Sequence, residues 1–597
     1  MNDHLALARS ALAAVGDGWK ADSAEREYLD FKETPETALS PEQLAKRNIG
    51  NERKRFYMLL AETAICLANA GGGVIVIGVR DRAATRADAV RGVDRQVYDP
   101  EGLRLAVFER TKPAMTVEVY EEDVDGVTVL LIRVPRGTVV HATSEGVYKR
   151  RVGDQCRPVA GDEMRDLQAA RGQYDWSAEL TDYDPQHVSR SALAVAADYL
   201  RRAGRSELAD LAEDDPAQFL SDTDLLFDGR LRRAAVLLYG RPECIRALVP
   251  DWGVILTSAR SAGGEGTVRI GREQSAERAM VPLIDDIRTT MSALASAETI
   301  RVLGTEITLI DYPVEDVVRE LVANAFAHRD WERPGIIEIR HSPDELVIVS
   351  PGGLLPTLHA DRLLRETAQR NHTIAREISR LRLAEGAGLG FDRVWRALAA
   401  LGKQPPTISP EPAFTVTVPG GQGDRTFARF LRGPAFPAPR MAEDLDVLLV
   451  LSVLRRRATV RAPQIAGFLQ RDAEATQRAL ARMQDAALIE PTAGTKRYQF
   501  PSYRLTAPVR AALRSALGYR VDSIDSDDGK LVRHLKRHGR ISNEDVRNYL
   551  DCDVATARNR LTRMRKKGWI DFAPDSPKRG PSVEYVATAA IDDIETS

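Results

Sequence analysis

The sequence has few cysteines and no long apolar run. Its 597 residues include four cysteines, which lie far apart at Cys66, Cys156, Cys244 and Cys552. No Cys-x-x-Cys pair occurs, so a zinc finger is not expected and a reducing compartment is favoured. The longest apolar runs, such as 73–79, fall well short of the roughly 20 residues that a membrane span needs. The N-terminus lacks a basic segment followed by an apolar core, so we predict a cytoplasmic protein without a signal peptide.

Two further absences limit the possible functions. The chain contains no Gly-Lys-Ser or Gly-Lys-Thr of a Walker A loop, which argues against a P-loop helicase motor. The glycines at 71–73 precede a strand and are followed by no lysine, so we interpret them as the end of a helix. The formal net charge is −2, so affinity for nucleic acid must come from a local basic patch. The length predicts roughly four globular domains.

The most informative segment runs from Glu320 to Asp330. On a helix, residues four positions apart share a face, so Glu320, Asn324 and His328 project together from one side. Apolar residues around them can bury the opposite side, namely Val317, Val318, Leu321, Val322, Ala325 and Phe326. A carboxylate and an amide oxygen on one face suit a hydrated Mg²⁺ ion and a water molecule to be activated.

Two glycine-rich turns follow this helix, at 350–354 and 386–390. Before the first turn, the apolar runs 335–340 and 345–349 predict an antiparallel strand pair joined at 341–344. In this order the three elements resemble the N box and the two glycine boxes of the GHKL ATPases, the superfamily of gyrase B, heat-shock chaperones, histidine kinases and MutL. The resemblance implies an α/β sandwich that binds ATP and hydrolyses it.

The same resemblance implies roles for individual residues. Asn324 would coordinate Mg²⁺, and Glu320 would orient or deprotonate the attacking water. The other candidate cofactor-binding residues lie on the helix face, in the two glycine turns and in a lid segment: His328, Ser350, Gly352, Gly353, Arg370, Asn371, Gly386, Gly388 and Gly390. The chain departs from the superfamily at Ser350, where an Asp usually accepts a hydrogen bond from the adenine amino group.

A second set of motifs occupies the N-terminal region. It begins with an acidic segment from Glu25 to Lys32 that enters a strand. An Asn-x-Gly-Gly-Gly sequence at 69–73 then leads to an apolar strand ending at Asp81, and a basic strand follows at 147–153. This pattern resembles the Schlafen AlbA_2 domain.

In nuclease-active Schlafens, three acids at these positions hold a divalent ion for phosphodiester cleavage. The resemblance therefore implies Glu25, Asp30 and Asp81 as ligands of Mg²⁺ or Mn²⁺, with Lys32 beside them. Asp30 stands where Glu is usual, and Glu27 could take the place of Glu25. A domain that binds nucleic acid or protein without cleavage stays open, as does a purely structural role for these acids.

Beyond a proline-rich linker at 433–439, the pattern changes to short helices. Residues 463–469 and 473–483 predict a helix-turn-helix, and the same order returns at 531–570, so tandem winged helices are expected. The segment 528–569 contains twelve Lys or Arg and only five Asp or Glu. This excess of positive charge makes the second unit the better candidate for DNA binding. The candidate nucleic-acid contacts on its recognition helix are Arg558, Asn559, Arg563, Arg565, Lys566 and Lys567.

Together these patterns predict a multidomain α+β protein. We expect a Schlafen AlbA_2-like α/β domain at 1–175, a helical or mixed connector at 176–300 and a GHKL-like α/β sandwich at 301–432. Tandem winged helix-turn-helix domains are expected at 441–517 and 526–590. This order resembles the bacterial AlbA_2-domain ATP-binding proteins, a transcriptional-regulator or RecG-like family.

Two functions follow from these expectations. The first is an ATP-binding, DNA-binding transcriptional regulator whose nucleotide state changes a lid or a dimer. The alternative is an ATP-gated nuclease that cleaves RNA or DNA through the N-terminal acids, in defence against phage. A histidine-kinase-like phosphotransferase is a weaker third, because no helix with an obvious phosphoacceptor histidine precedes Tyr312. The resemblance implies ATP and Mg²⁺ as cofactors, Mn²⁺ as an alternative at the N-terminal acids, and a homodimer.

Overall fold

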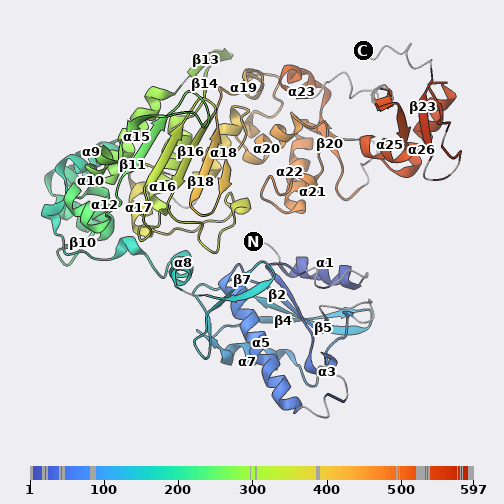
Figure 1. The fold of residues 1–597 in the computed structure, drawn as a ribbon, viewed down its shortest axis with the longest axis horizontal. Helices are drawn as coiled ribbons and strands as arrows, with labels where there is room; N and C mark the ends of the chain where they lie inside the picture. Colours follow the sequence, from blue (N-terminus) through green and yellow to red (C-terminus); the bar gives the residue numbers. More distant parts are fainter. Residues whose placement is uncertain are drawn as a thin grey trace.

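The computed structural model describes residues 4–16, 21, 25–38, 42–43, 48–80, 89–159, 161–295, 297–302, 305–384, 390–492, 495, 498–518, 531–532, 534–535, 538–550, 552–574, 576–578, 580 and 583–588. The chain forms a mixed α/β protein with several separate sheets (Figure 1). An N-terminal part is followed by a central part on a six-stranded sheet and by a C-terminal part that ends in a small unit. No helix among the described residues is long and apolar enough to cross a membrane.

The N-terminal part is a four-stranded sheet of order β1-β2-β5-β4 with helices on both faces. Its elements are α1 (His4–Gly16), β1 (Leu29–Lys32), α5 (Ile49–Asn69), β2 (Gly73–Ile77), α7 (Pro100–Arg110), β4 (Glu118–Val124) and β5 (Val127–Val134). Side chains alternate along a strand, so Ile75 and Ile77 of β2 pack towards α5 and α7. Val74 and Val76 pack towards α1 on the other face. This double burial explains why β2 is apolar throughout.

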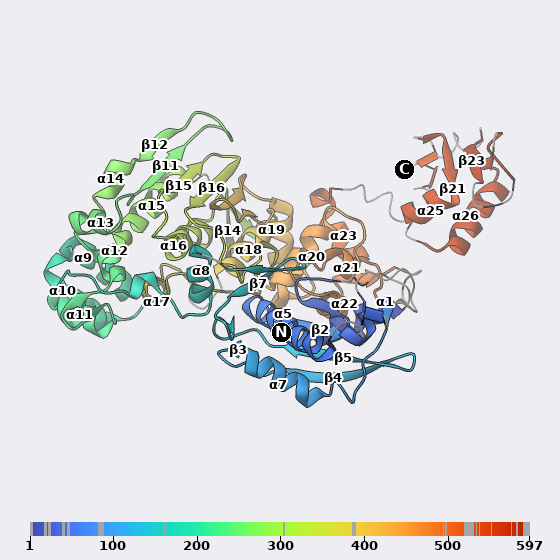
Figure 2. The same cartoon turned by 60° about the horizontal axis from the view of Figure 1, so that its bottom comes forward.

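A disulfide ties a hairpin to α5. The hairpin consists of β7 (Lys149–Val152) and β8 (Gln155–Pro158), which pack against α5 (Figure 2). Cys66 of α5 and Cys156 of β8 form the disulfide across 90 positions of sequence. The wide spacing of the cysteines gave no sign of this pairing. The spacing of the cysteines therefore does not support a reducing compartment.

The central part is built on a sheet of order β12-β11-β15-β16-β18-β17. Its strands are β11 (Val254–Ser258), β12 (Thr267–Ile270), β15 (Ile337–His341), β16 (Glu345–Ser350), β17 (Thr407–Ser409) and β18 (Phe414–Pro419). The predicted hairpin is confirmed as β15 and β16, with Arg340 paired to Val347. Strands β11 and β12 come from the segment expected to be a connector. They join this sheet because β11 pairs in parallel with β15.

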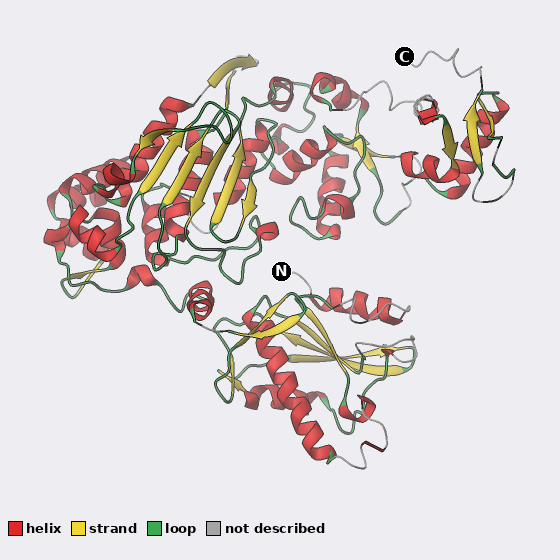
Figure 3. Cartoon of the chain, viewed as in Figure 1, coloured by secondary structure: helices red, strands yellow, loops and turns green. Residues whose placement is uncertain are grey.

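Helices pack around this sheet and share one hydrophobic core with it (Figure 3). Those that precede the sheet or enclose it are α9 (Arg190–Arg202), α10 (Ser206–Asp214), α11 (Pro216–Asp222), α12 (Arg233–Tyr239), α13 (Pro242–Leu248), α15 (Met280–Leu294), α16 (Arg319–His328), α17 (His372–Arg380) and α18 (Gly390–Ala400). The predicted helix after Pro313 is confirmed, but its first turn, Val314–Val318, is π-helical. Such turns occur frequently at functional sites.

The C-terminal part contains two helical units. In the first, α20 (Leu445–Leu454), α21 (Ala462–Ile465) and α22 (Ala473–Asp485) share the central core and are followed by the strand pair β19 (Ile489–Pro491) and β20 (Tyr503–Leu505). The second contains α25 (Asn543–Leu550), α26 (Val554–Lys566) and a sheet of β21 (Arg540–Ser542), β23 (Glu584–Ala587) and β22 (Ile570–Phe572). Its own core includes Leu531, Ile541 and Leu561.

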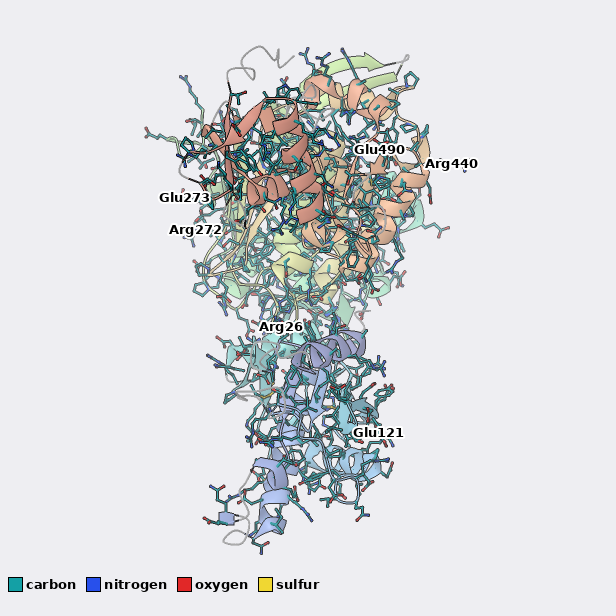
Figure 4. The ribbon with its side chains drawn as sticks, turned by 90° about the vertical axis from the view of Figure 1, so that its right-hand side faces the viewer. Arg26, Glu121, Arg272, Glu273, Arg440 and Glu490 are labelled. Atoms are coloured by element: carbon teal, nitrogen blue, oxygen red, sulfur yellow. A yellow bond between two sulfur atoms is a disulfide. The ribbon has the colours of Figure 1, made fainter. Side chains whose placement is uncertain are left out.

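The chain contains 84 Lys or Arg and 86 Asp or Glu, so basic and acidic groups are nearly equal in number. Figure 4 shows Arg26 and Glu121 on the N-terminal part and Arg272 beside Glu273 on the central part, and all four are exposed. Acidic and basic groups are therefore interspersed at these places. A patch of one sign has to be sought on individual elements.

Candidate functional site

The candidate site starts from three side chains of α16. Glu320 is completely buried, and Asn324 one turn later donates from Nδ2 to Glu320 Oε1 over 3.5 Å. His328 lies one further turn along, and both Asn324 and His328 line a cavity next to the helix. The structure therefore brings together the three side chains that the four-residue spacing placed on one face.

Gly390, the first residue of α18, closes the site on the side of Glu320. A Cβ atom built on Gly390 would overlap Glu320 Oε1 and lie 3.0 Å from Asn324 Nδ2. This close approach between α16 and α18 leaves room only for a glycine. The other glycines of this turn, Gly386 and Gly388, lie outside the described residues.

The cavity gathers six of the predicted residues from four separate segments. These are Asn324, His328, Ser350, Gly353, Arg370 and Gly390. Much of the remaining wall is apolar, with Leu354, Leu355, Leu358, Leu363, Phe391 and Phe414. A mostly apolar wall with a few convergent polar groups is typical of a small-molecule site.

The first glycine turn supports the cavity through its backbone. Ser350 Oγ donates a hydrogen bond of 2.9 Å to the carbonyl of Ala325, so its hydroxyl is tied to α16. Gly352 has a φ of 99°, and a Cβ atom there would lie 2.7 Å from Asp330 Cβ. Both facts require glycine at this position. Gly353, the next residue, contributes to the wall of the cavity.

Arg370 and Asn371 end the segment 363–371, which we call the lid segment, and they have different contacts. The Asn371 Nδ2 group donates to the carbonyls of Ala327 at 2.9 Å and Arg329 at 2.8 Å. These bonds satisfy two carbonyls at the C-terminus of the helix, which otherwise have no partner within it. Arg370 is buried, and its Nη2 donates to Gly353 O over 3.2 Å. Asn371 thus acts on α16, whereas Arg370 reaches the cavity.

Arg370 also connects the cavity to α8 (Asp162–Ala170), the helix that follows the β7–β8 hairpin. Its Nη1 forms an ion pair with Asp166 of α8 and lies 3.6 Å from Asp330 Oδ2. A second, more polar cavity lies here between α8 and the central part, and Arg370 lines both cavities. Burial raises the pKa of Asp166, although the Arg370 guanidinium opposes this shift. Arg370 therefore lines both of these cavities.

His328 is held neutral inside the cavity. Burial lowers its pKa to about 4, and the positive charge of Arg370 acts in the same direction. At neutral pH the ring therefore offers one donor and one acceptor nitrogen and carries no charge. It can hydrogen-bond a ligand without repelling a metal ion nearby.

The N-terminal acids are arranged differently. Asp30 is buried on β1 and forms ion pairs with Lys32 and with Arg151 of β7, whose Nη1 lies 2.5 Å from Asp30 Oδ1. Arg151 is also buried and donates to Leu29 O over 3.0 Å. Two cations thus neutralise the Asp30 carboxylate, so this arrangement of side chains does not fit a metal ion at Asp30.

Glu25 and Glu27 have other contacts in the structure. Glu25 Oε1 accepts a hydrogen bond of 3.0 Å from the Phe31 backbone N–H. Glu27 lies 3.3 Å from Nε2 of His359 in the central part. Asp81 lies outside the described residues. Among the residues that the structure describes, no three His, Cys, Asp or Glu side chains come close enough to hold a metal ion.

The basic residues of α26 form an exposed face. Ala557, Leu561 and Met564 turn inward to the small core of this unit. The six predicted contact residues are exposed: Arg558, Asn559, Arg563, Arg565, Lys566 and Lys567. The Lys567 ammonium lies 4.0 Å from the centre of the Trp569 ring. The helix is therefore held by its apolar side and presents its charges to the solvent.

The sequence did not single out Arg151, Asp166 or Glu366 as parts of these sites. Arg151 stands in a recognised basic strand, but only the register of the hairpin shows that it reaches Asp30. Asp166 and Arg370 are 204 positions apart. Glu366 lies in the lid segment and lines the cavity, and no local pattern distinguishes it from other surface acids.

Comparison with known families supports two parts of this arrangement. Residues 25–160 match the family model described as "Schlafen, AlbA_2". Residues 335–418 match the model described as "Putative ATP-dependent DNA helicase recG C-terminal". The first match covers the N-terminal sheet and the β7–β8 hairpin, and the second runs from β15 to β18. The chain is thus a multidomain α/β protein with a Schlafen AlbA_2 domain, and part of its central sheet matches the model named for the RecG C-terminal region.

Comparison with whole proteins and solved structures finds a structural likeness and no curated relative. No curated protein matches the chain. Among solved structures, the crystal structure of the DIP2311 protein from Corynebacterium diphtheriae is similar, with 23% sequence identity and a TM-score of 0.49. The similarity covers 86% of this chain and 99% of that chain. A likeness at this level carries no argument about function.

Proposed function

We propose that this protein is a nucleic-acid-binding regulator controlled by ATP, with a GHKL-like nucleotide site in its central part. The observation that carries the proposal is the convergence of three motifs on one cavity. Asn324 and His328 reach it from α16, Gly353 from the first glycine turn and Gly390 from the start of α18. The match of residues 335–418 to a model named for an ATP-dependent DNA helicase supports the same function.

The residues of this site fit a metal-bound triphosphate. Asn324 donates from Nδ2 to Glu320, which leaves its Oδ1 on the opposite side of the amide. An amide oxygen is a ligand that Mg²⁺ accepts, and the ion would neutralise charge on the phosphates. Arg370 supplies a guanidinium group that can pair with a phosphate. Glu320, held next to Gly390, would orient the attacking water during hydrolysis.

The C-terminal units would provide the contact with DNA. Both combine a helix-turn-helix order with a strand pair or small sheet, as winged helices do. In the second unit, α26 presents Arg558, Asn559, Arg563 and Lys566 on its exposed side. Such a helix can attract phosphates and read base edges in the major groove. The protein would then act as a nucleotide-controlled regulator of transcription.

Salt-dependent binding to duplex DNA tests the DNA-binding half of the proposal. The wild type should bind in a gel shift with an affinity that falls steeply with salt, and ATP with Mg²⁺ should change that affinity. Arg563→Ala/Lys566→Ala should weaken binding roughly tenfold and reduce the salt slope by about 1–2. The matched control, Arg205→Ala/Arg429→Ala, removes the same charge from exposed positions of the central part and should bind normally. Failure of the wild type to bind duplex DNA would contradict the proposal.

A metal-dependent nuclease is the alternative, and the ion pairs of Asp30 argue against it. An N-terminal domain that binds nucleic acid or protein without cleavage fits these pairs better. The test is incubation of labelled RNA and single-stranded and duplex DNA with Mn²⁺, with and without ATP. Intact substrates support the regulator. Cleavage that disappears in Glu25→Gln would establish the nuclease instead.

A further inference from the structure

The nucleotide cavity lacks the carboxylate that its resemblance to GHKL ATPases leads one to expect. Ser350 occupies that position, and its hydroxyl already donates to the Ala325 carbonyl over 2.9 Å. An acceptor for the amino group of adenine must therefore come from another residue of the wall. Among the residues that the structure describes, Glu366 is the one acid that lines the cavity.

Glu366 has one carboxylate oxygen that lacks a hydrogen-bond donor among the described residues. Its Oε2 is buried and accepts no hydrogen bond from any described residue. Its Oε1 is only weakly engaged, by Arg362 Nη1 at 3.5 Å, and the side chain is 28% exposed. A buried carboxylate oxygen without a donor is unfavourable, so an N–H group of a bound ligand would relieve that penalty.

The other lining residues indicate two further features of a ligand. Arg370 is the permanently charged cation among the lining residues, and the apolar side chains of Leu355, Leu363 and Phe414 belong to the same wall. The cavity therefore suits a molecule that combines an N–H donor, a flat apolar body and an anionic group. A nucleotide whose base carries an exocyclic amine has these three features.

We propose that Glu366 accepts a hydrogen bond from the exocyclic amine of adenine and thereby makes the site selective for ATP over nucleotides without this amine. This inference rests on the proposed nucleotide site. The carboxylate reaches the base from the lid segment, after the first glycine turn. Base recognition is thereby coupled to the position of this segment. Glu366 is a specificity-determining residue and takes no part in hydrolysis.

The test compares ATP with purine riboside triphosphate, which lacks the amine, by calorimetry on the full chain. The wild type should bind ATP roughly 10- to 100-fold more tightly, because a hydrogen bond to a charged group is lost in the analogue. Glu366→Ala should bind both nucleotides about equally, with its affinity for the analogue unchanged. Glu366→Gln keeps an uncharged acceptor oxygen and should retain a preference of a few-fold. Glu273→Gln, at an exposed position outside the cavity, should behave as the wild type.

The outcomes separate this inference from the proposed function. If the wild type binds ATP and Glu366→Ala keeps the full preference, the role of Glu366 is overturned while the nucleotide site stands. If the wild type binds the analogue as tightly as ATP, amine recognition is likewise overturned. If the wild type binds neither nucleotide, the nucleotide site itself is wrong and this inference falls with it. Circular dichroism and thermal unfolding of each variant confirm that the binding data refer to folded protein.

Discussion

The central cavity and the N-terminal acids began as similar sets of motifs, but the structure treats their polar groups in opposite ways. In the cavity, Asn324, His328 and Glu366 belong to a wall that also contains many apolar side chains. In the N-terminal domain, Asp30 is enclosed by Lys32 and Arg151. The first arrangement leaves hydrogen-bonding capacity for a ligand. The second pairs both carboxylate oxygens of Asp30 with cations of the same domain.

This difference shows that a carboxylate in the expected place is not sufficient evidence for a metal site. A buried acid is stable when cations and hydrogen bonds compensate it, and these same partners occupy the positions that a metal would need. An acceptor without a partner at the edge of a cavity carries the opposite signal. The following predictions test this contrast.

The largest effect is expected from Arg151→Ala. This change leaves Asp30 buried with only Lys32 to compensate it, so the N-terminal domain should lose about 3–5 kcal/mol of stability. The measurement is hydrogen exchange of peptides from residues 25–160 in the full chain under increasing urea. Arg150→Ala serves as the control, because its pair with Glu163 is partly exposed and should contribute less than about 1 kcal/mol. Equal losses of stability in the two variants would show that the buried Arg151–Asp30 pair contributes no more than the partly exposed Arg150–Glu163 pair.

Loss of the disulfide should have the next largest effect. The Cys66–Cys156 bond closes 90 positions of sequence and holds β8 on α5, next to the strand that carries Arg151. Cys66→Ser/Cys156→Ser should therefore destabilise the N-terminal domain by about 2–4 kcal/mol. The same exchange experiment measures it, and nucleotide binding in the central part should stay unchanged. Insensitivity of the wild type to a thiol reductant would show that the disulfide contributes nothing.

Gly390→Ala tests the central side of the comparison. Its Cβ atom would overlap the buried Glu320 carboxylate and crowd Asn324, so these two side chains would have to shift. We expect ATP affinity to fall about 100-fold, equivalent to roughly 2.7 kcal/mol. Calorimetry measures the change, and Gly467→Ala is the control, because a Cβ atom there meets nothing within 4 Å. Normal affinity of Gly390→Ala would place the nucleotide elsewhere.

A smaller effect is expected from Asp166→Asn. Arg370 pairs with Asp166 of α8 and also lines the central cavity, so we expect the acid to compete with a bound phosphate for the guanidinium. Removing the negative charge should strengthen ATP binding several-fold, up to about tenfold. Asp162→Asn, on the same helix and more exposed, is the control. Weaker binding by Asp166→Asn would mean that the acid positions Arg370 instead of competing for it.

The remaining prediction concerns pH. The pKa of His328 is about 4 in the folded chain, against about 6.5 for an unfolded histidine. Between these values the unfolded chain binds a proton that the folded chain does not, so stability should fall as pH decreases from 6.5 to 4. His328→Gln should reduce this fall in thermal unfolding experiments. An identical pH profile for wild type and variant would show that His328 does not titrate as described.

Local sequence patterns predicted individual helices and hairpins better than the contacts between segments that are distant in sequence. The four-residue spacing on α16 and the β15–β16 hairpin depend on neighbouring residues and were confirmed. The parallel pairing of β11 with β15, Val254 opposite Ile337, joins distant segments, so no local signal placed β11 in the central sheet. The pairing of Arg151 with Asp30, 121 positions away, was hidden for the same reason. Partners that are distant in sequence decide which acids remain available to a ligand.

The most direct test of the account is Mg²⁺-dependent ATP binding by the full chain, compared between Asn324→Ala and Glu25→Gln. The account places the nucleotide and its metal at α16, so Asn324→Ala should lose the Mg²⁺-dependent part of the affinity, about tenfold or more. Glu25→Gln keeps the acceptor oxygen that Phe31 N–H requires and should bind as the wild type does. Wild-type binding by Asn324→Ala together with a loss in Glu25→Gln would contradict the account.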